Sequence, residues 1–375
     1  MPETWTHTAL AQQVLFGPGR VREVPAALRT AGGRRVLLVT TEGRAASPEG
    51  AALVAGLGRS LASTFTGVAT HVPTPVVQQA VLQARRDAVD IVVSFGGGSC
   101  ADLGKAVCFF LEQEAGMPGS SHLDRPVTPH ISIPTTYSGA ELTPFFGMTD
   151  PNTGQKQGAG GPTTAPVVVV YDPELTASTP LRVRAETGMN ALAHCVEAAW
   201  SPRRTPAAEA MALAGAAALA RALPAVVTGA GHDDDPDDPA SLAAALEGAC
   251  LAGQALQNAG LGVHHGLSQL LGGRTGIAHG LLNAVLLPHS IRCNEPAVPD
   301  AVARIGAALG DPDDAAGAVE RLLVTLRLPA RLSEIGVDEA ELEVVARMAP
   351  SNGNVAANPR PLGEADVLAL LRDAW

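Results

Sequence analysis

The sequence predicts an α/β domain with a parallel sheet, followed by an all-helical domain. Three observations support this. The chain has 375 residues, enough for two domains that each bury a core. Its first half alternates apolar, β-branched segments with segments of helical spacing, whereas strand patterns nearly vanish after Asp172. Hydrophobic residues make up 46% and charged residues 17%, as in a well-packed globular protein.

The first domain is expected to be Rossmann-like, spanning residues 1–177. Continuous apolar strands separated by helices indicate a parallel sheet buried on both faces. The expected strands are 34–41, 90–99 (running into glycines), 130–136 and 167–173, and the expected helices are 48–63, 76–88 and one after the glycines.

The second domain is expected to span residues 178–375, after the turn-rich joint "PELTASTP". Ala- and Leu-rich segments with helical periodicity follow this joint. The expected helices are 184–200, 206–223, 241–258, 279–289, 299–309, 314–326, 338–348 and 363–375.

Composition also limits the class of function. A net charge of −11 gives no basic face for nucleic acid. The N-terminus lacks a signal-peptide pattern, and we expect no apolar run long enough to cross a bilayer, so a cytoplasmic protein without membrane contact is predicted. The five cysteines are scattered and indicate reduced core residues.

Lysine is rare in this chain. Of 26 basic residues only Lys105 and Lys156 are lysines. A lysine that persists among so many arginines can mark a position that needs an ammonium, although two lysines left by chance would look the same.

The segment "SFGGGSCADLGKAV" (94–107) predicts a phosphate cradle. Glycines after a strand allow a ligand to approach the backbone closely, and a helix N-terminus offers N–H groups to an anion. A plain tight connection is the alternative. The cofactor-binding candidates here are Gly96, Gly97, Gly98, Ser99 and Asp102, with Lys105 nearby.

Two further segments are candidates for the same cofactor. "IPTTYSGAELTPFFGMTD" (133–150) also follows a strand, where open α/β sheets bind ligands, and it offers Thr135, Thr136 and Ser138. Such a turn could instead cap itself. Lys156 lies in the loop that follows and could approach the same crevice.

Histidines from separate helical segments predict a second site. Asn190 and His194 are four residues apart and therefore share one helix face, while His264, His265 and His279 come from later segments. Three histidines and one oxygen ligand would suit Zn²⁺ or Fe²⁺, but the oxygen here belongs to an amide. A lone histidine in a helical domain is usually a packing or surface residue. Histidines that come from three separate segments instead indicate a shared site.

These motifs together resemble the iron-containing (group III) alcohol dehydrogenase superfamily, and within it the maleylacetate reductases. The resemblance rests on "VLFGPGRVREVP", "GGGSCADLGKAV", "IPTTYSGAELTPFFG", "YDPELTASTP", "GMNALAHCVEA", "HHGLSQLLGG", "AHGLLNAVLLPH" and "NPRPLGEADVLALLRDAW". Metal-using members have one Asp and three His ligands, which match Asn190, His194, His265 and His279 here. Asn at the first position is characteristic of maleylacetate reductases, which are associated with metal-independent turnover.

The resemblance implies a dehydroquinate synthase-like two-domain architecture with NADH or NADPH between the domains. It implies hydride transfer to maleylacetate, giving 3-oxoadipate, with a small oxo-acid as the partner molecule and a homodimer as the assembly. His194, His265, His279 and Asn190 would form the catalytic pocket, with His265 a candidate proton donor. His264 and Arg360 would bind substrate. If a metal is present, Zn or Fe would be held by His194, His265 and His279.

Three departures from the family pattern leave alternatives open. Gln269 replaces a family histidine, Asp102 follows the broader dehydrogenase pattern, and Thr41 with Glu42 stands where an Asp often holds the ribose, so the coenzyme is undecided. The alternatives are a metal-dependent alcohol or polyol dehydrogenase, a biosynthetic relative acting on another oxo-acid, a dehydroquinate synthase-like lyase, and a non-catalytic nucleotide sensor.

Overall fold

The computed structural model describes residues 4–116, 126–152, 156–231 and 235–375. The chain divides into two compact units, one of residues Ala9–Thr179 and one of Pro180–Trp375 together with the N-terminal segment up to Thr8. The sequence analysis expected a division at 177/178. It did not assign the N-terminal segment to the helical unit, where Thr8 N–H donates to Asn258 Oδ1 over 2.8 Å.

The α/β unit is built on a six-stranded sheet of order β1-β8-β5-β4-β2-β3, in which each strand pair is parallel. The strands are β1 Gln13–Phe16, β2 Val36–Thr40, β3 Leu61–Phe65, β4 Ile91–Gly96, β5 His130–Pro134 and β8 Val168–Tyr171, with a separate antiparallel pair, β6 Phe145–Thr149 and β7 Lys156–Gly160. The predicted parallel sheet is confirmed.

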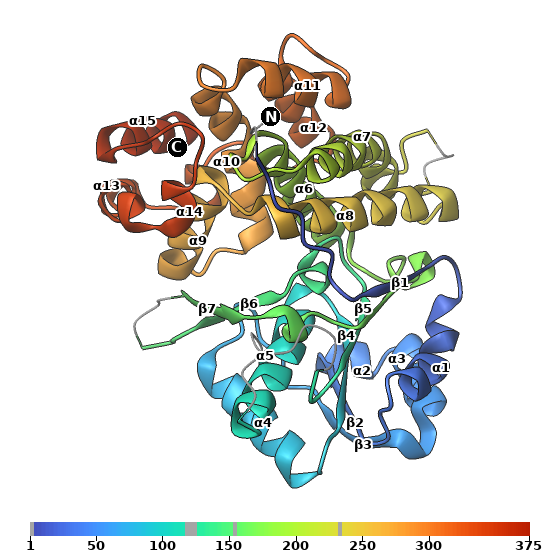
Figure 1. Ribbon diagram of the computed structural model, residues 1–375. Helices are drawn as coiled ribbons and strands as arrows, with labels where there is room; N and C mark the ends of the chain where they lie inside the picture. Colours follow the sequence, from blue (N-terminus) through green and yellow to red (C-terminus); the bar gives the residue numbers. More distant parts are fainter. Residues whose placement is uncertain (1–3, 117–125, 153–155, 232–234) are drawn as a thin grey trace. The chain divides into compact units, whose positions relative to one another are not determined.

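Helices cover both faces of this sheet (Figure 1). They are α1 Val24–Thr30, α2 Glu42–Ala45, α3 Pro48–Leu57, α4 Thr74–Arg86 and α5 Gly98–Glu114. Along β2, Val36 and Leu38 pack with α1 and α3, while Leu37 and Val39 pack with α4 and α5. This two-sided burial explains why the strands read as unbroken apolar runs.

Some expected elements of this unit differ in the structure. The helix expected over 48–63 ends at Leu57, because Gly58 adopts φ 51°, and the chain then continues into β3. The short strands β1, β6 and β7 were not expected, since their four or five residues carry too little periodicity to be recognised.

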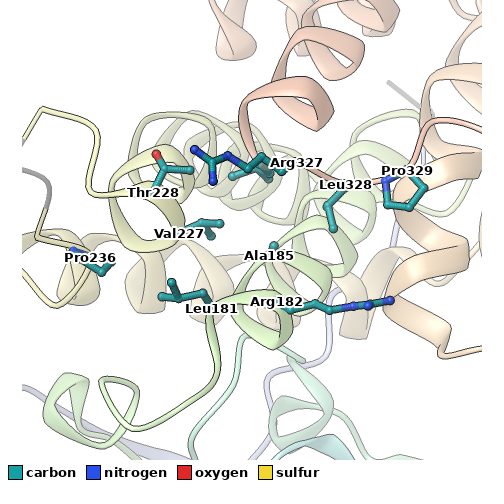
Figure 2. A pocket seen from close by; sticks show the side chains of 10 residues that line it. Leu181, Arg182, Ala185, Val227, Thr228, Pro236, Arg327, Leu328 and Pro329 are labelled. Carbon is teal, nitrogen blue, oxygen red and sulfur yellow. The ribbon is translucent and has the colours of Figure 1, made fainter.

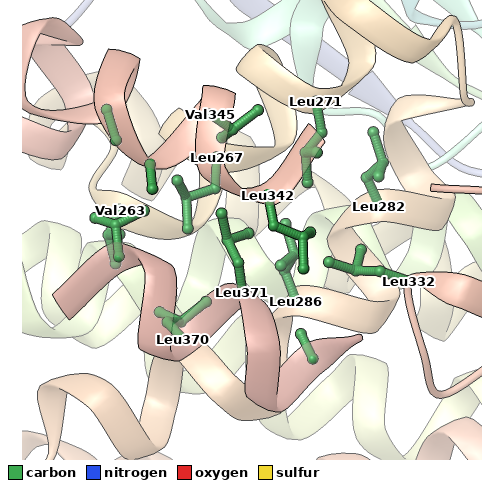
Figure 3. Close-up of a cluster of buried hydrophobic side chains, with 14 of the residues drawn as sticks. Val263, Leu267, Leu271, Leu282, Leu286, Leu332, Leu342, Val345, Leu370 and Leu371 are labelled. Carbon is green, nitrogen blue, oxygen red and sulfur yellow. The ribbon is translucent and has the colours of Figure 1, made fainter. Parts of the chain in front are cut away.

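The second unit is helical, as expected. Its helices are α6 Leu181–Trp200, α7 Pro206–Thr228, α8 Pro239–Ala259, α9 Val263–Thr275, α10 His279–Asn294, α11 Pro299–Leu309, α12 Ala315–Thr325, α13 Glu339–Met348, α14 Gly353–Ala356 and α15 Glu364–Ala374. One core cluster joins α9, α10, α13 and α15 through side chains such as Leu267, Leu286, Val345 and Leu371 (Figure 3). Helix α9 was not expected, because its glycines obscure the helical pattern.

Helix α7 corrects one expectation. This helix of 23 residues is long and apolar enough to cross a membrane, whereas we expected no such segment from the sequence. The helix packs against α6 and α8, and Leu219, Leu223 and Val226 are fully buried. A core helix of a helical unit has the same length and composition, and this burial accounts for the apolar sequence.

Candidate active site

The glycine-rich turn lies at the carboxyl end of β4. Gly96 has φ 145°, a conformation that favours glycine, and α5 begins two residues later. A Cβ atom on Gly97 would lie 3.2 Å from Thr136 Cγ2, and one on Gly98 would lie 3.0 Å from Ser138. The glycines therefore allow the turn to pack tightly against the segment after β5, which brings together two of the sequence-predicted groups.

The arrangement around this turn fits a dinucleotide. Helices after β2 and after β4 cover opposite faces of the sheet, so the turn lies at a topological switch point, where open α/β sheets bind ligands. No side chain of the described residues caps α5, which leaves its N-terminus open to an anion. Thr136 Oγ1 is buried without a hydrogen-bond partner in the described residues. An acceptor on a bound nucleotide would satisfy that hydroxyl.

Other candidates near this turn have protein partners. Thr135 N–H donates to Gly96 O over 2.9 Å, and Ser138 Oγ donates to Glu141 Oε2 over 3.2 Å. Burial raises the pKa of Glu141, which also accepts from the Tyr171 hydroxyl. Ser99 lies in the first turn of α5. Of the hydroxyls on Ser99, Thr135, Thr136 and Ser138, the one on Thr136 is buried without a hydrogen-bond partner among the described residues, and it adds to the open N-terminus of α5.

Lys105 is a fully buried cation on α5. Its Nζ donates to Ala140 O over 2.8 Å, to Thr143 Oγ1 over 3.2 Å and to Phe145 O over 2.5 Å. It also lies 2.8 Å from Asp102 Oδ1. The ammonium thus links the segment after β5 to α5, and the Asp102 carboxylate is its ion-pair partner. The rarity of lysine was a useful signal, and the requirement it marks is structural.

The end of β2 supplies a further contact that sequence reasoning missed. Thr41 caps α2 by accepting from Arg44 N–H over 3.3 Å. The Arg44 guanidinium donates to Ser178 Oγ and Thr179 Oγ1, each over 2.6 Å, and burial lowers its pKa. Arg44 therefore holds the last residues of this unit in place. Lys156 is the first residue of β7 rather than part of a loop.

The histidine cluster lies within the helical unit. The His194 ring, on α6, stacks on that of His265, on α9, with ring centroids 4.6 Å apart. The His279 ring, at the start of α10, is centred 5.6 Å from that of His265. Burial is the main cause of a His194 pKa well below the usual value, so this imidazole is neutral at physiological pH. The structure thus brings together the three predicted histidines.

Glu197 organises this cluster and was missed by the sequence analysis. It is 1% exposed, and burial raises its pKa. Its Oε1 accepts from His264 N–H over 2.9 Å, and its Oε2 lies 2.8 Å from His265 Nδ1. The available signal was a lone acid in the apolar segment "GMNALAHCVEAAW", one helical turn after His194.

His264 faces the protein interior. Its Nε2 donates to Asn283 O over 2.9 Å, its Nδ1 lies 3.2 Å from His265 Nδ1, and burial lowers its pKa to about 4. Together Glu197, His264 and His265 could hold a cation by proximity alone, since their ligand atoms lie within 4.8 Å of one another. Hydrogen bonds already engage these atoms, and this favours a structural network over a metal site.

Asn190 decides how well the predicted ligand set fits a metal. It is 7% exposed on α6, and its Oδ1 accepts from Asn283 Nδ2 over 2.5 Å. A divalent cation bound by three neutral histidines would gain no anionic ligand from Asn190, and binding would compete with this hydrogen bond. With an amide at this position, the donor set is a weaker fit for Zn²⁺ or Fe²⁺ than three histidines with a carboxylate would be.

Two other candidates, Gln269 and Arg360, form side-chain hydrogen bonds with neighbouring protein groups. Gln269 Oε1 accepts from Asn354 Nδ2 over 3.0 Å. Arg360 donates to Cys293 O and to Asp366 Oδ1, each over 2.9 Å. These bonds use Arg360 to fix the C-terminal segment, which does not favour its expected contact with a substrate carboxylate.

A surface cavity of about 560 Å³ is lined by other residues of the helical unit (Figure 2). It is formed by the start of α6, the end of α7 and the segments before α8 and after α12, and its lining includes Arg182 and Arg327. None of its lining residues belongs to the histidine cluster or to the glycine-rich turn. It therefore contributes nothing to the candidate active site.

Comparison with known proteins agrees with this geometry. Residues 11–173 match the family model of iron-containing alcohol dehydrogenases, and residues 184–375 match the model of the family's C-terminal domain. The chain is 35% identical over 373 residues to maleylacetate reductase of Rhizobium sp. (strain MTP-10005), covering 100% of this chain and 98% of that protein.

Two solved structures share the fold over the whole chain. The crystal structure of maleylacetate reductase from Agrobacterium tumefaciens is 34% identical, with a TM-score of 0.86, and covers 100% of this chain and 99% of that one. The iron-containing alcohol dehydrogenase from Corynebacterium glutamicum is 28% identical, with a TM-score of 0.85, and covers 100% and 97%. The chain therefore belongs to the iron-containing alcohol dehydrogenase family and is an oxidoreductase.

Proposed function

We propose that this oxidoreductase uses NADH or NADPH to reduce maleylacetate, or a closely related unsaturated oxo-acid, without a metal ion. The observation that carries the proposal is Asn190, whose oxygen accepts a hydrogen bond from Asn283 at the position where the metal-using members that the chain resembles have an anionic Asp ligand. The relatives named maleylacetate reductase, at 35% identity over nearly the full chain, support the substrate class.

The chemistry of such a substrate suits a metal-free site. A simple ketone needs a Lewis acid or a proton donor to polarise its oxygen, whereas a conjugated oxo-acid spreads incoming charge over its own carbonyl. When bound, the reduced nicotinamide supplies a hydride. The glycine-rich turn and Thr136 would bind the nucleotide phosphates.

The histidine cluster would bind the oxo-acid and deliver the proton that completes the reduction. His194 and His279 would donate hydrogen bonds to the substrate's oxygens. His265, if protonated, would release its proton from Nε2 while Glu197 pairs with the imidazolium across the 2.8 Å contact at Nδ1. One hydride and one proton together convert the carbon–carbon double bond to a single bond.

The test is consumption of NADH and of NADPH with maleylacetate, using protein stripped with a chelator and assayed without added metal. Turnover under these conditions is the expected result. Activity that returns only with Zn²⁺ or Fe²⁺ would overturn the metal-free reaction and favour a metal-dependent alcohol or polyol dehydrogenase. Nucleotide binding without turnover on any oxo-acid would favour a sensor.

We propose a cytoplasmic location and a homodimer, because the family resemblance suggests this assembly. Fractionation of the source cells and light scattering of the purified protein would test them. A monomer in solution would contradict the second.

A further inference from the structure

A buried carboxylate on α6 engages both neighbouring histidines of α9. Glu197 accepts from the His264 backbone N–H through one oxygen, and its other oxygen contacts His265 Nδ1. The fit is close, because a Cβ on Gly262 would lie 2.9 Å from Glu197 Oε1. Burying a carboxylate without a cation partner costs free energy, so a buried Glu in an apolar helix points to a role beyond packing.

The hydrogen bonds around His264 determine which nitrogen of His265 carries the proton. His264 Nε2 must carry hydrogen, because it donates to the Asn283 carbonyl. In neutral His264 the Nδ1 atom is then an acceptor. It lies 3.2 Å from His265 Nδ1, which must be the donor in that contact. The hydrogen on His265 is therefore on Nδ1, shared between His264 and Glu197.

We propose that Glu197 is a positioning residue for the reduction: it holds the His265 ring and keeps its hydrogen on Nδ1, so that Nε2 is the nitrogen presented to the oxo-acid. This inference rests on the proposed function for its catalytic consequence. Its structural part, the tautomer and orientation of the ring, stands on the contacts alone. A carboxylate that fixes an imidazole in this way acts through the histidine and does not touch the substrate.

The variant Glu197→Gln tests this directly. The amide has the shape of the carboxylate, but its NH₂ group would donate to His265 Nδ1 and move the hydrogen to Nε2. We expect kcat to fall by roughly 100-fold or more, as when a wrong imidazole tautomer is imposed, with KM changed by less than about threefold because direct substrate contacts remain. Glu197→Asp keeps the charge and should recover part of the lost kcat.

A matched control is Glu209→Gln in the same unit. Glu209 is partly buried, with 13% of its side chain exposed, and pairs with Arg204 and Arg304 rather than with a histidine. This variant loses an acid and some stability, and we expect its kcat to match the wild type. Equal losses of kcat in both Gln variants would overturn a specific role for Glu197.

The tautomer is read separately by ¹⁵N NMR of histidine-labelled protein, with His265 assigned from the signal lost in His265→Gln. We expect hydrogen on Nδ1 in the wild type and on Nε2 in Glu197→Gln. Unchanged spectra would overturn the inference whatever the kinetics. If the wild type does not reduce maleylacetate, the proposed function fails, while the tautomer shift still decides whether Glu197 positions the ring. If Glu197→Gln does not fold, the same spectra are recorded on Glu197→Asp.

Discussion

Replacing Lys105 with Met should destabilise the α/β unit by more than most single substitutions do. The methionine fills much of the same volume but leaves Ala140 O, Thr143 Oγ1 and Phe145 O without the ammonium that they share. Removing one partner of a buried ion pair costs about 3–5 kcal/mol. Hydrogen bonds to a charged group contribute about 1.5–3 kcal/mol each.

These contributions do not add in full. The Asp102 side chain is 23% exposed, so water recovers part of its lost interaction. We therefore expect a loss of about 3–5 kcal/mol in the free energy of unfolding. For a unit of this size each kcal/mol corresponds to about 2–4 °C, so its thermal transition should fall by about 10 °C.

Calorimetry of Lys105→Met, with the exposed Arg59→Met as the control for removing a cation, measures this effect. Affinity for the proposed nucleotide, NADH or NADPH, should also fall, because Lys105 holds the segment that carries Ser138 against α5. A thermal transition within about 1 °C of the wild type would refute this reasoning. Lys105 would then be a lysine present by chance rather than one that the fold requires.

Three further perturbations have defined outcomes. Burial lowers the pKa of His130 from 6.5 to about 3, so its contribution to stability is complete above pH 6.5 and is lost as pH falls towards 3. Between pH 7 and pH 5 the wild type should lose about 2 kcal/mol of unfolding free energy through this residue. In urea titrations, His130→Gln should lose about 2 kcal/mol less over the same pH range than the wild type does. Asn190→Asp should raise Zn²⁺ affinity at least 10-fold by adding an anionic ligand, and equal affinities by calorimetry would contradict the inference that Asn190 stands beside the three histidines as the missing anionic ligand. Arg327 has φ 55° just beyond the end of α12, so Arg327→Gly should stabilise the protein by about 1 kcal/mol, and a lower denaturation midpoint would count against this.

Local patterns were sufficient for the fold class and for the location of the cofactor candidates. Buried parallel strands need apolar residues at every position, and a turn packed against a neighbouring segment needs glycine, so β2, β4 and the turn at Gly97 can be recognised from adjacent residues alone. The shared helix face of Asn190 and His194 follows equally from their spacing.

Partners far apart in the chain required the tertiary structure. Glu197 and His265 are separated by 68 residues, and no periodicity records that their side chains meet. The same holds for Lys105, whose partners lie beyond the next strand, and for the N-terminal segment, which joins the helical unit through Asn258. Periodicity specifies which face of an element is buried, because burial depends on the element's own side chains. Which polar groups then pair inside that buried space depends on how the elements pack. Only this packing brings Glu197, a lone acid in an apolar helix, into contact with the His265 ring.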